Sequence, residues 1–301
     1  RLFHVSFKRG VRLMRIYKYF ILVCVMSPMA YAGEAINNVT SHVDSTIESW
    51  AKQNISNLRL IEVETRIRNY SKTDYRILGM TELSGTNNEK YLSQFSFSSF
   101  DSTETLNLGV VWRKLNVNQT LMYGYNAFYD HEINSNHSRI GFGIELKSSV
   151  YDVNFNMYHA LSDKKVVDGV TEEAADGYDL EVGIYMPYMP WAKVYYKGYK
   201  WNSSIFDIKH GEVLSLHLQP TGRFTIEAGI HDDNTMSNDR EFIKLSYVVC
   251  CSNDTTNRKF VFMTPQAYSY TSVADRFYEK VRRENNIVKG INGAAVIGRG
   301  T

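Results

Sequence analysis

Cysteine, proline and long apolar runs are all scarce in this chain. It has three cysteines in 301 residues, and two of them, Cys250 and Cys251, are adjacent. A disulfide between neighbouring residues is strained and uncommon, so we expect two thiols at a strand end and no disulfide framework. Only 5 prolines occur beside 21 tyrosines, which favours β-strands. No stretch approaches 18 uninterrupted apolar residues, so the sequence predicts no transmembrane helix.

The residue spacings that catalytic and metal sites need are also missing. The 8 histidines are scattered, with no H-x-x-x-H or C-x-x-C spacing for a metal. Asp130 and His131 are types that general-base catalysis uses, but neighbours on a strand point to opposite faces. Gly141 and Gly143 lack the third glycine and the following helix of a nucleotide site. We therefore predict a protein that is not an enzyme and binds no cofactor or metal.

Charge is nearly balanced once the first residues are set aside. Residues 1–32 hold six of the 34 basic residues and no acidic one, so the remaining 28 basic and 32 acidic residues give a net charge of −4. This balance does not indicate nucleic-acid binding. Arg15 and Lys18, the apolar residues 19–26 and the small-x-small sequence at 30–32 predict a secretory signal peptide. Met14 is an alternative start of translation. An exported chain without a transmembrane helix is periplasmic, secreted or an outer-membrane barrel.

Alternating apolar and polar residues are the main structural signal. Leu106, Leu108 and Val110, for example, alternate with Asn107 and Gly109, which predicts a strand with one apolar and one polar face. Two arrangements use such strands: a soluble sandwich with the apolar faces inward, or a membrane barrel with the apolar faces outward. The pattern predicts about twelve strands, at residues 58–67, 76–84, 91–100, 105–115, 119–132, 138–147, 150–161, 177–187, 190–201, 212–219, 223–232 and 240–250.

The connections between these strands favour the membrane barrel. Short connections at 116–118, 147–149, 186–190 and 220–222 alternate with longer polar ones at 69–75, 132–138, 162–176, 202–211 and 232–239. Short turns at one end and long loops at the other, with an even number of strands, are typical of outer-membrane barrels. Aromatic residues near strand ends, such as Trp112 and Tyr188, fit the girdles at a lipid–water interface. We therefore predict an all-β fold, a 12-stranded antiparallel outer-membrane β-barrel surrounded by outer-membrane lipid.

Two further segments flank the predicted barrel. Ile36, Val39 and Val43 recur at helical spacing, which predicts a small helix on the periplasmic side. Residues 275–288 predict a strongly charged helix, and the tail at 291–301 has no structural signal. The predicted organisation is a signal region at 1–32, a periplasmic helix at 33–56, the barrel at 57–251 and a linker with a short tail at 252–301.

Four motifs make the chain resemble the intimin/invasin family of inverse autotransporters. They are YGYNAFYD at 123–130 with RIGFG at 139–143, DGYD at 176–179, MPYMP at 186–190, and residues 276–288 with the core RENNIV at 283–288. The resemblance implies a 12-stranded barrel that the barrel-assembly and periplasmic chaperone machinery inserts. It also implies that a linker re-enters the pore and delivers an adhesive passenger to the cell surface, where the passenger meets a host-cell receptor.

The passenger is where this sequence departs from the family. Passengers of the family are rows of immunoglobulin-like domains, and residues 290–301 are far fewer than the ~100 residues of one such domain. We therefore expect a translocator barrel, associated with cell adhesion, whose passenger is missing or truncated in this sequence. The alternative is a stand-alone outer-membrane pore.

Charged residues predict what the linker does. A barrel of twelve strands leaves a lumen unless something fills it, and charge pairs away from bulk water are less screened. We expect the linker to plug the pore by pairing its cations with carboxylates of the wall; the alternative is a solvated periplasmic helix. The candidate linker residues are Arg276, Tyr278, Lys280, Arg282, Arg283, Asn285 and Asn286, and the candidate lumen carboxylates are Glu145, Asp179, Glu181 and Glu227, with Glu62 and Glu64 also facing inward.

Overall fold

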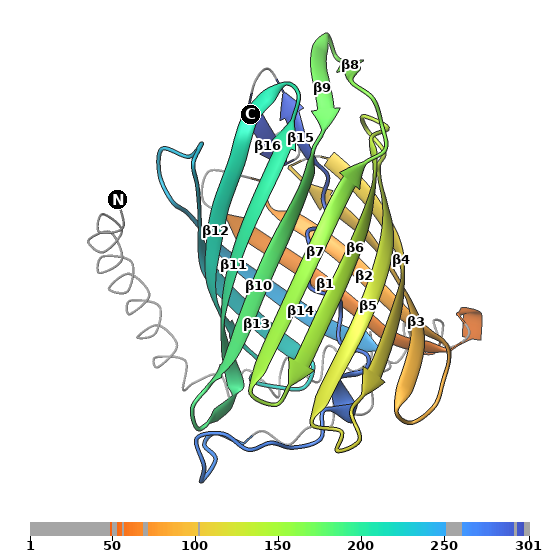
Figure 1. Cartoon of the computed structure of the whole chain (residues 1–301), viewed down its shortest axis with the longest axis vertical. Helices are drawn as coiled ribbons and strands as arrows, with labels where there is room; N and C mark the ends of the chain where they lie inside the picture. Colours follow the sequence, from red (N-terminus) through yellow and green to blue (C-terminus); the bar gives the residue numbers. More distant parts are fainter. Residues whose placement is uncertain are drawn as a thin grey trace. The chain divides into compact units, whose positions relative to one another are not determined.

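Twelve antiparallel strands close into a barrel, as predicted (Figure 1). The computed structural model describes residues 49, 53–55, 57–68, 72–101, 103–250, 261–291 and 294–297, with backbone only at 206–208, 291 and 294–297. The predicted signal region and nearly all of the predicted helix at 33–56 lie outside the described residues. The barrel strands are β1 Leu58–Arg68, β2 Asp74–Gly85, β3 Glu89–Phe100, β4 Thr103–Leu115, β5 Leu121–Glu132, β6 Ser138–Ser148, β7 Tyr151–Ala160, β10 Asp176–Met186, β11 Met189–Ser203, β12 Phe206–Leu218, β13 Phe224–Asp233 and β14 Arg240–Cys250.

Each strand pairs with its neighbour along the chain, and β14 pairs with β1 to close the ring. We call the end of the barrel that holds the β4–β5, β6–β7 and β10–β11 connections the turn end, and the opposite end the loop end. The predicted long loop at 202–211 is wrong, because β11 and β12 continue to a tight turn at residues 204–205. Glu173 stabilises this turn: its carboxylate accepts hydrogen bonds from the Ser204 N–H (2.6 Å) and hydroxyl (3.0 Å).

The apolar faces of the strands point outward. On β4, Leu108 is 60% exposed, whereas Asn107 and Arg113 on the opposite face are buried. The same alternation recurs on β5, β6, β7 and β10. A soluble sandwich would bury these apolar faces against each other, so the outward faces exclude that arrangement and favour a lipid surround.

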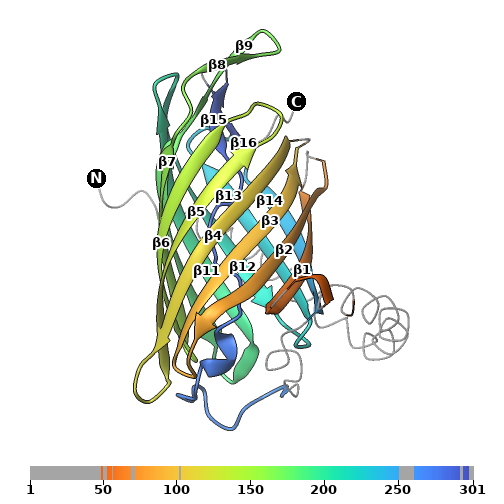
Figure 2. The ribbon, with the colours of Figure 1, turned by 90° about the vertical axis from the view of Figure 1, so that its right-hand side faces the viewer.

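A second, smaller sheet lies at the loop end (Figures 1 and 2). It consists of β8 (Lys165–Val167) and β9 (Val170–Ala174), both from the β7–β10 connection, and of β15 (Val288–Ile291) and β16 (Ala294–Ile297) from the end of the chain. The order is β16-β15-β9-β8. These four strands were not predicted.

Two smaller observations complete the fold. Cys250, buried at the end of β14, is disulfide-bonded, so the expected free thiol at this position is wrong; Cys24 and Cys251 lie outside the described residues. No helix in the described part of the chain has the length and apolar character needed to cross a membrane.

Candidate functional site: the linker inside the barrel

Residues 261–291, here called the linker, begin along the turn end of the barrel and then run through it to the loop end (Figure 2). At the turn end, the Val273 N–H donates to the Gln119 carbonyl in the β4–β5 turn (2.8 Å). At the loop end, Lys289 of β15 lies opposite Ala174 of β9. Only one 3-10 turn, η1 Ala274–Arg276, is helical, so the helix predicted over 275–288 is wrong beyond this turn.

Side chains of the wall replace the hydrogen bonds that a helix would have made. A backbone without regular secondary structure in a closed space must find partners for its N–H and C=O groups, and here the partners come from β3, β4, β6 and β7. The Val281 N–H donates to Gln94 (2.9 Å), and the Glu284 N–H donates to Tyr158 (2.7 Å). Arg113 donates to the carbonyls of Phe277 and Glu279 (2.6 Å for Glu279). Three more linker carbonyls accept from the wall: Arg282 from Asn156 (3.1 Å), Glu284 from Arg139 (2.8 Å) and Asn285 from Asn107 (2.8 Å).

Arg276 fixes the linker near the turn end. Its guanidinium makes two hydrogen bonds to the Asp152 carboxylate of β7 (2.7 and 2.9 Å) and one to the Ser148 carbonyl (2.6 Å). Glu279 of the linker pairs with the same guanidinium (2.8 Å). Arginine can satisfy several acceptors at once because its donors form a rigid planar fork.

Lys280 points to the opposite side of the wall. Its ammonium pairs with Glu62 and Glu64 of β1, at 2.9 Å for Glu64. Glu64 is itself bound by Arg76 of β2 (2.6 Å). The linker cation therefore joins a charge cluster that already connects two strands.

Arg282 makes the widest set of contacts. It donates to both carboxylate oxygens of Glu181 on β10 (2.5 and 3.0 Å) and to Glu227 on β13 (3.0 Å). Its guanidinium also lies 3.8 Å from the centre of the Tyr195 ring, a cation–π geometry. Gly183 faces Tyr195 across the β10–β11 pair, and a Cβ there would collide with the ring. The glycine thus leaves room for the tyrosine on which Arg282 rests.

Arg283 turns back toward β5. It makes two hydrogen bonds to the Asp130 carboxylate (2.9 and 2.7 Å) and lies over the Phe128 ring (4.3 Å to its centre). Arg139 of β6 binds the same carboxylate (2.8 Å). All three charged groups are buried, so none of them can exchange its partner for water without moving the linker.

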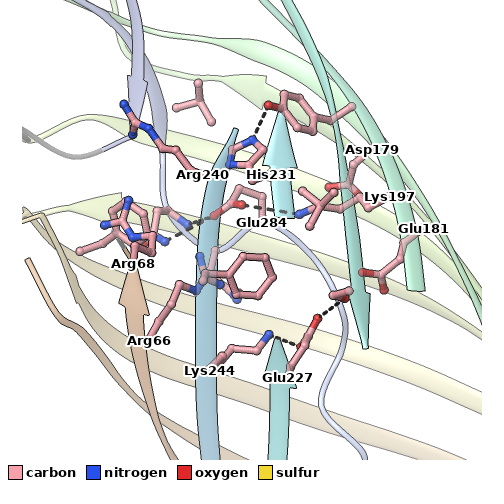
Figure 3. A pocket seen from close by; sticks show the side chains of 18 of the residues that line it. Arg66, Arg68, Asp179, Glu181, Lys197, Glu227, His231, Arg240, Lys244 and Glu284 are labelled. Atoms are coloured by element: carbon pink, nitrogen blue, oxygen red, sulfur yellow. Dashed lines mark hydrogen bonds and ion pairs between the residues drawn. The ribbon is translucent and has the colours of Figure 1, made fainter. Parts of the chain in front are cut away.

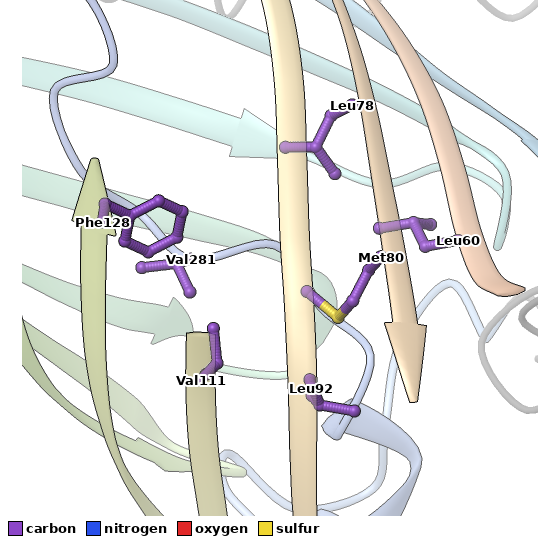
Figure 4. Close-up of a cluster of buried hydrophobic side chains, with 7 residues drawn as sticks. All are labelled: Leu60, Leu78, Met80, Leu92, Val111, Phe128 and Val281. Carbon is purple, nitrogen blue, oxygen red and sulfur yellow. The ribbon is translucent and has the colours of Figure 1, made fainter. Parts of the chain in front are cut away.

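One apolar contact accompanies these charges. Val281 packs against a cluster on the β1–β5 side of the lumen (Figure 4). The cluster consists of Leu60, Leu78, Met80, Leu92, Val111 and Phe128. A second cluster at the turn end joins Val273 and Phe277 to Leu115 and Met122. Burial of these side chains favours the inserted linker over a hydrated one.

Lys289 closes the contacts at the loop end. It is fully buried and pairs with Glu132 of β5 and with Glu172 of β9 (3.1 Å for Glu172). His137, in the β5–β6 loop, lies beside this group, with its Nδ1 2.7 Å from the Ser162 hydroxyl. Burial, together with the nearby ammonium groups of Lys289 and Lys165, lowers the pKa of His137 to about 4.

The linker leaves part of the lumen open. A polar cavity of about 1000 Å³ lies between it and the wall formed by β10–β14 and β1 (Figure 3). Arg66, Lys197, Lys244, Glu227 and Glu284 are among the side chains that surround it. No cluster of three or more His, Cys, Asp or Glu side chains suited to a metal occurs among the residues that the structure describes.

The comparisons with known proteins agree with this arrangement. The family described as "Inverse autotransporter, beta-domain" matches residues 27–285. The chain belongs to this family. The resemblance found in the sequence motifs is thereby confirmed.

Two curated proteins are similar to this inverse autotransporter barrel. Invasin of Yersinia enterocolitica is 24% identical over 173 residues, which are 56% of this chain and 20% of the invasin. An attaching and effacing protein homolog of Escherichia coli (strain K12) is 26% identical over 126 residues, 41% of this chain and 42% of that protein. The chain thus spans less than half the length of either relative.

A solved structure supports the fold alone. It comes from work on "the Mechanism Behind the in-meso Crystallization of Membrane Proteins" and superposes with a TM-score of 0.64 at 16% identity, covering 77% of this chain and 100% of that one. Family and fold together show an outer-membrane translocator barrel in contact with lipid, located in the bacterial outer membrane. Both the family and the fold are of the membrane-barrel type and not of an enzymatic type. In such barrels short turns face the periplasm and long loops face outward, which assigns the turn end to the periplasm.

The predicted site residues fall into three groups. Arg276, Lys280, Arg282 and Arg283 all meet carboxylates of the wall, and Glu181 and Glu227 both receive Arg282. Glu145 instead binds Arg113 and Lys147, and Asp179 binds Asn156 and Tyr158, so neither meets a linker cation. The other candidates are uncharged and make hydrogen bonds: Tyr278 donates to Glu82 (2.7 Å), Asn285 accepts through its carbonyl from Asn107, and Asn286 accepts from Ser98 (3.0 Å).

Sequence reasoning missed several wall residues as partners of the linker. Asp130 and Asp152 lie on the inward face of their strands, and the apolar–polar alternation that predicted the strands also applied to them. Glu172 gave no such signal, because it lies in a segment read as a loop.

Proposed function

We propose that this barrel exports and anchors a C-terminal passenger whose chain continues from the linker, and that the passenger serves cell adhesion. The observation that carries the proposal is the path of the linker, which enters at the turn end and joins β9 at the loop end. A pore that served diffusion alone would have no use for a segment of its own chain along its whole length. The adhesive role is taken by analogy with the relatives named invasin and attaching and effacing protein homolog.

The ion pairs supply the anchoring. Linker cations bind carboxylates on β1, β5, β7, β10 and β13, so a pull on the outer end of the chain is shared by five strands spread round the ring. Removing one partner of a buried pair costs about 3–5 kcal/mol, because it leaves an uncompensated charge. The proposed partners are the outer-membrane lipid, the barrel-assembly and periplasmic chaperone machinery during insertion, and a host-cell receptor for the passenger.

The site residues have a proposed role in this scheme. Arg276, Lys280, Arg282 and Arg283 would hold the exported linker in place and reduce the flow of ions through the lumen. The hydrogen bonds of Tyr278, Asn285 and Asn286 would set the register of the segment. The predicted division into a signal region, a periplasmic helix, the barrel and the linker belongs to the same proposal.

Surface labelling of intact bacteria tests the direction of export. One variant carries an epitope after Thr301, and a matched variant carries the same epitope within residues 40–48. We expect antibody to label the first on intact cells and the second only after the outer membrane is permeabilised. Labelling of the Thr301 epitope only in permeabilised cells would show that the chain does not leave through the barrel, and the proposal would be wrong.

A further inference from the structure

A short part of the linker follows the rim of the barrel before it enters the lumen. Residues 261–273, here called the rim strap, contact the β10–β11, β6–β7 and β4–β5 turns in that order. Thr264 donates to the Tyr188 carbonyl (2.9 Å), Thr271 to the Ser149 hydroxyl (3.2 Å) and Val273 to the Gln119 carbonyl (2.8 Å). These turns belong to neighbouring hairpins of the ring, so the rim strap follows the circumference of the wall.

The rim strap exposes apolar side chains. Tyr270 is 72% and Phe262 65% exposed, and Val261, Met263 and Tyr268 are exposed as well. Such a concentration of large apolar residues on one short surface segment marks an interaction site. The thirteen residues contain no Asp, Glu, Lys or Arg, so the segment offers no charge for an ionic partner.

The exposed side chains continue the aromatic residues of the barrel. The Trp191 ring of β11 stacks on Phe262, with 6.0 Å between ring centres and an interplanar angle of 23°, and its indole N–H donates to the Phe262 carbonyl (2.9 Å). Tyr188 in the β10–β11 turn and Tyr151 at the start of β7 are exposed at the same end of the barrel. Tyrosine and tryptophan gather where a membrane barrel meets the lipid headgroups.

We propose that the rim strap is a membrane-interface anchor. Phe262, Met263, Tyr268 and Tyr270 lie in the headgroup region of the leaflet at the turn end, where their apolar parts leave water and the tyrosine hydroxyls stay hydrated. This contact holds the start of the linker at the level of the membrane, beside the opening that it enters. The inference needs only the membrane barrel and does not depend on export of a passenger.

Quenching by brominated lipids tests the proposal on the full chain in phosphatidylethanolamine/phosphatidylglycerol nanodiscs. Tyr270→Trp places a reporter on the rim strap, and Val166→Trp places one on β8, where the native side chain is equally exposed (73%) but lies in the loop-end sheet. The parent protein supplies the background emission of its four native tryptophans. We expect brominated acyl chains to remove emission from the Tyr270→Trp reporter and to leave the Val166→Trp reporter unchanged.

Tyr268→Trp serves as a second reporter if Tyr270→Trp does not fold. Emission from the rim strap that brominated lipid leaves unchanged and aqueous iodide quenches would place the segment in water, and the proposal would be overturned. Because the nanodisc holds only this chain and lipid, a protein partner cannot produce the quenching by lipid.

Discussion

Arg282 shows how single residues hold the linker. It joins Glu181 on β10 to Glu227 on β13, and Glu227 also pairs with Lys244 (2.5 Å). The Tyr195 ring covers one face of the guanidinium, which limits its access to water. A planar, permanently charged group suits this position, because a lysine ammonium could not make the fork of bonds to two carboxylates and also stack on the ring.

Replacing Arg282 by alanine should both weaken and open the barrel. Glu181 and Glu227 would be left as buried carboxylates without their linker partner, which should lower the free energy of unfolding by about 3 kcal/mol. The cavity beside the linker would also widen where the Arg282 side chain lines it, so we expect ion conductance to rise. Thermal unfolding in detergent and single-channel recording in planar bilayers measure the two effects.

Arg282→Lys is the matched control for this change. It keeps the charge and loses the fork geometry, so we expect an intermediate loss of stability and little change in conductance. Unaltered conductance in Arg282→Ala, and in a double variant with Arg283→Ala, would contradict the plug.

At the scale of elements, the sheet at the loop end is what ties the end of the linker to the barrel. The β8–β9 hairpin turns at Asp168 and Gly169, which have positive φ values of 51° and 79°. Asp-Gly between two apolar residues is a strong signal for such a hairpin, and the sequence contained it. The pairing of β9 with β15 had no local signal, because the two strands lie more than 110 residues apart in the chain.

The low pKa of His137 makes this sheet sensitive to acid. An unfolded histidine takes up a proton near pH 6.5, whereas folded His137 does so only at about 4. The unfolded state therefore binds more protons between these values, and the stability of the loop-end sheet should fall as pH drops from about 6.5 toward 4. Hydrogen exchange of the β15 amides, corrected for the intrinsic pH dependence and referred to the β4 amides, should show the loss.

His137→Gln supplies the comparison for the pH experiment. It keeps a polar side chain near Ser162 and cannot titrate, so β15 should then keep the same relative protection from pH 7 to pH 5. An identical acid response in the variant and the parent would assign the effect to another group and contradict the prediction.

The strands were predictable from the sequence, and the path of the linker was predictable only in part. Alternation placed Leu108 outward and Asn107 inward because a wall with lipid on one side imposes period two on every strand. The linker lies inside the lumen, so no contact with lipid imposes a periodic pattern on its residues. Its cations point in several directions, to Asp152, Glu64 and Glu181 among others. Their density in the sequence predicted a charged helix, but the chain has no regular secondary structure between η1 and β15. Which carboxylate each cation meets depends on the closed ring, and no local pattern encodes it.

At the scale of the whole molecule, the lumen is shared between the linker and the polar cavity. The linker packs on β1–β5 through the cluster around Val281, and the cavity remains between the linker and the wall formed by β10–β14 and β1. The translocator and the stand-alone pore differ in what they require of this division. A translocator needs the linker to hold the lumen nearly closed after export, whereas a pore needs the cavity to conduct.

Removing the linker should decide between these readings. In a variant that ends at Cys251, the lumen carboxylates lose their linker partners, but water enters and solvates them, so the loss of stability should be smaller than the sum of the single ion pairs. Conductance should rise severalfold over that of the full chain, because a dozen strands leave a wide lumen when nothing fills it. The control is a variant that ends at Gly290, which keeps every linker cation up to Lys289 and should conduct as little as the full chain. If the full chain already conducts as well as the variant that ends at Cys251, the linker does not close the lumen, and the protein works as a stand-alone pore.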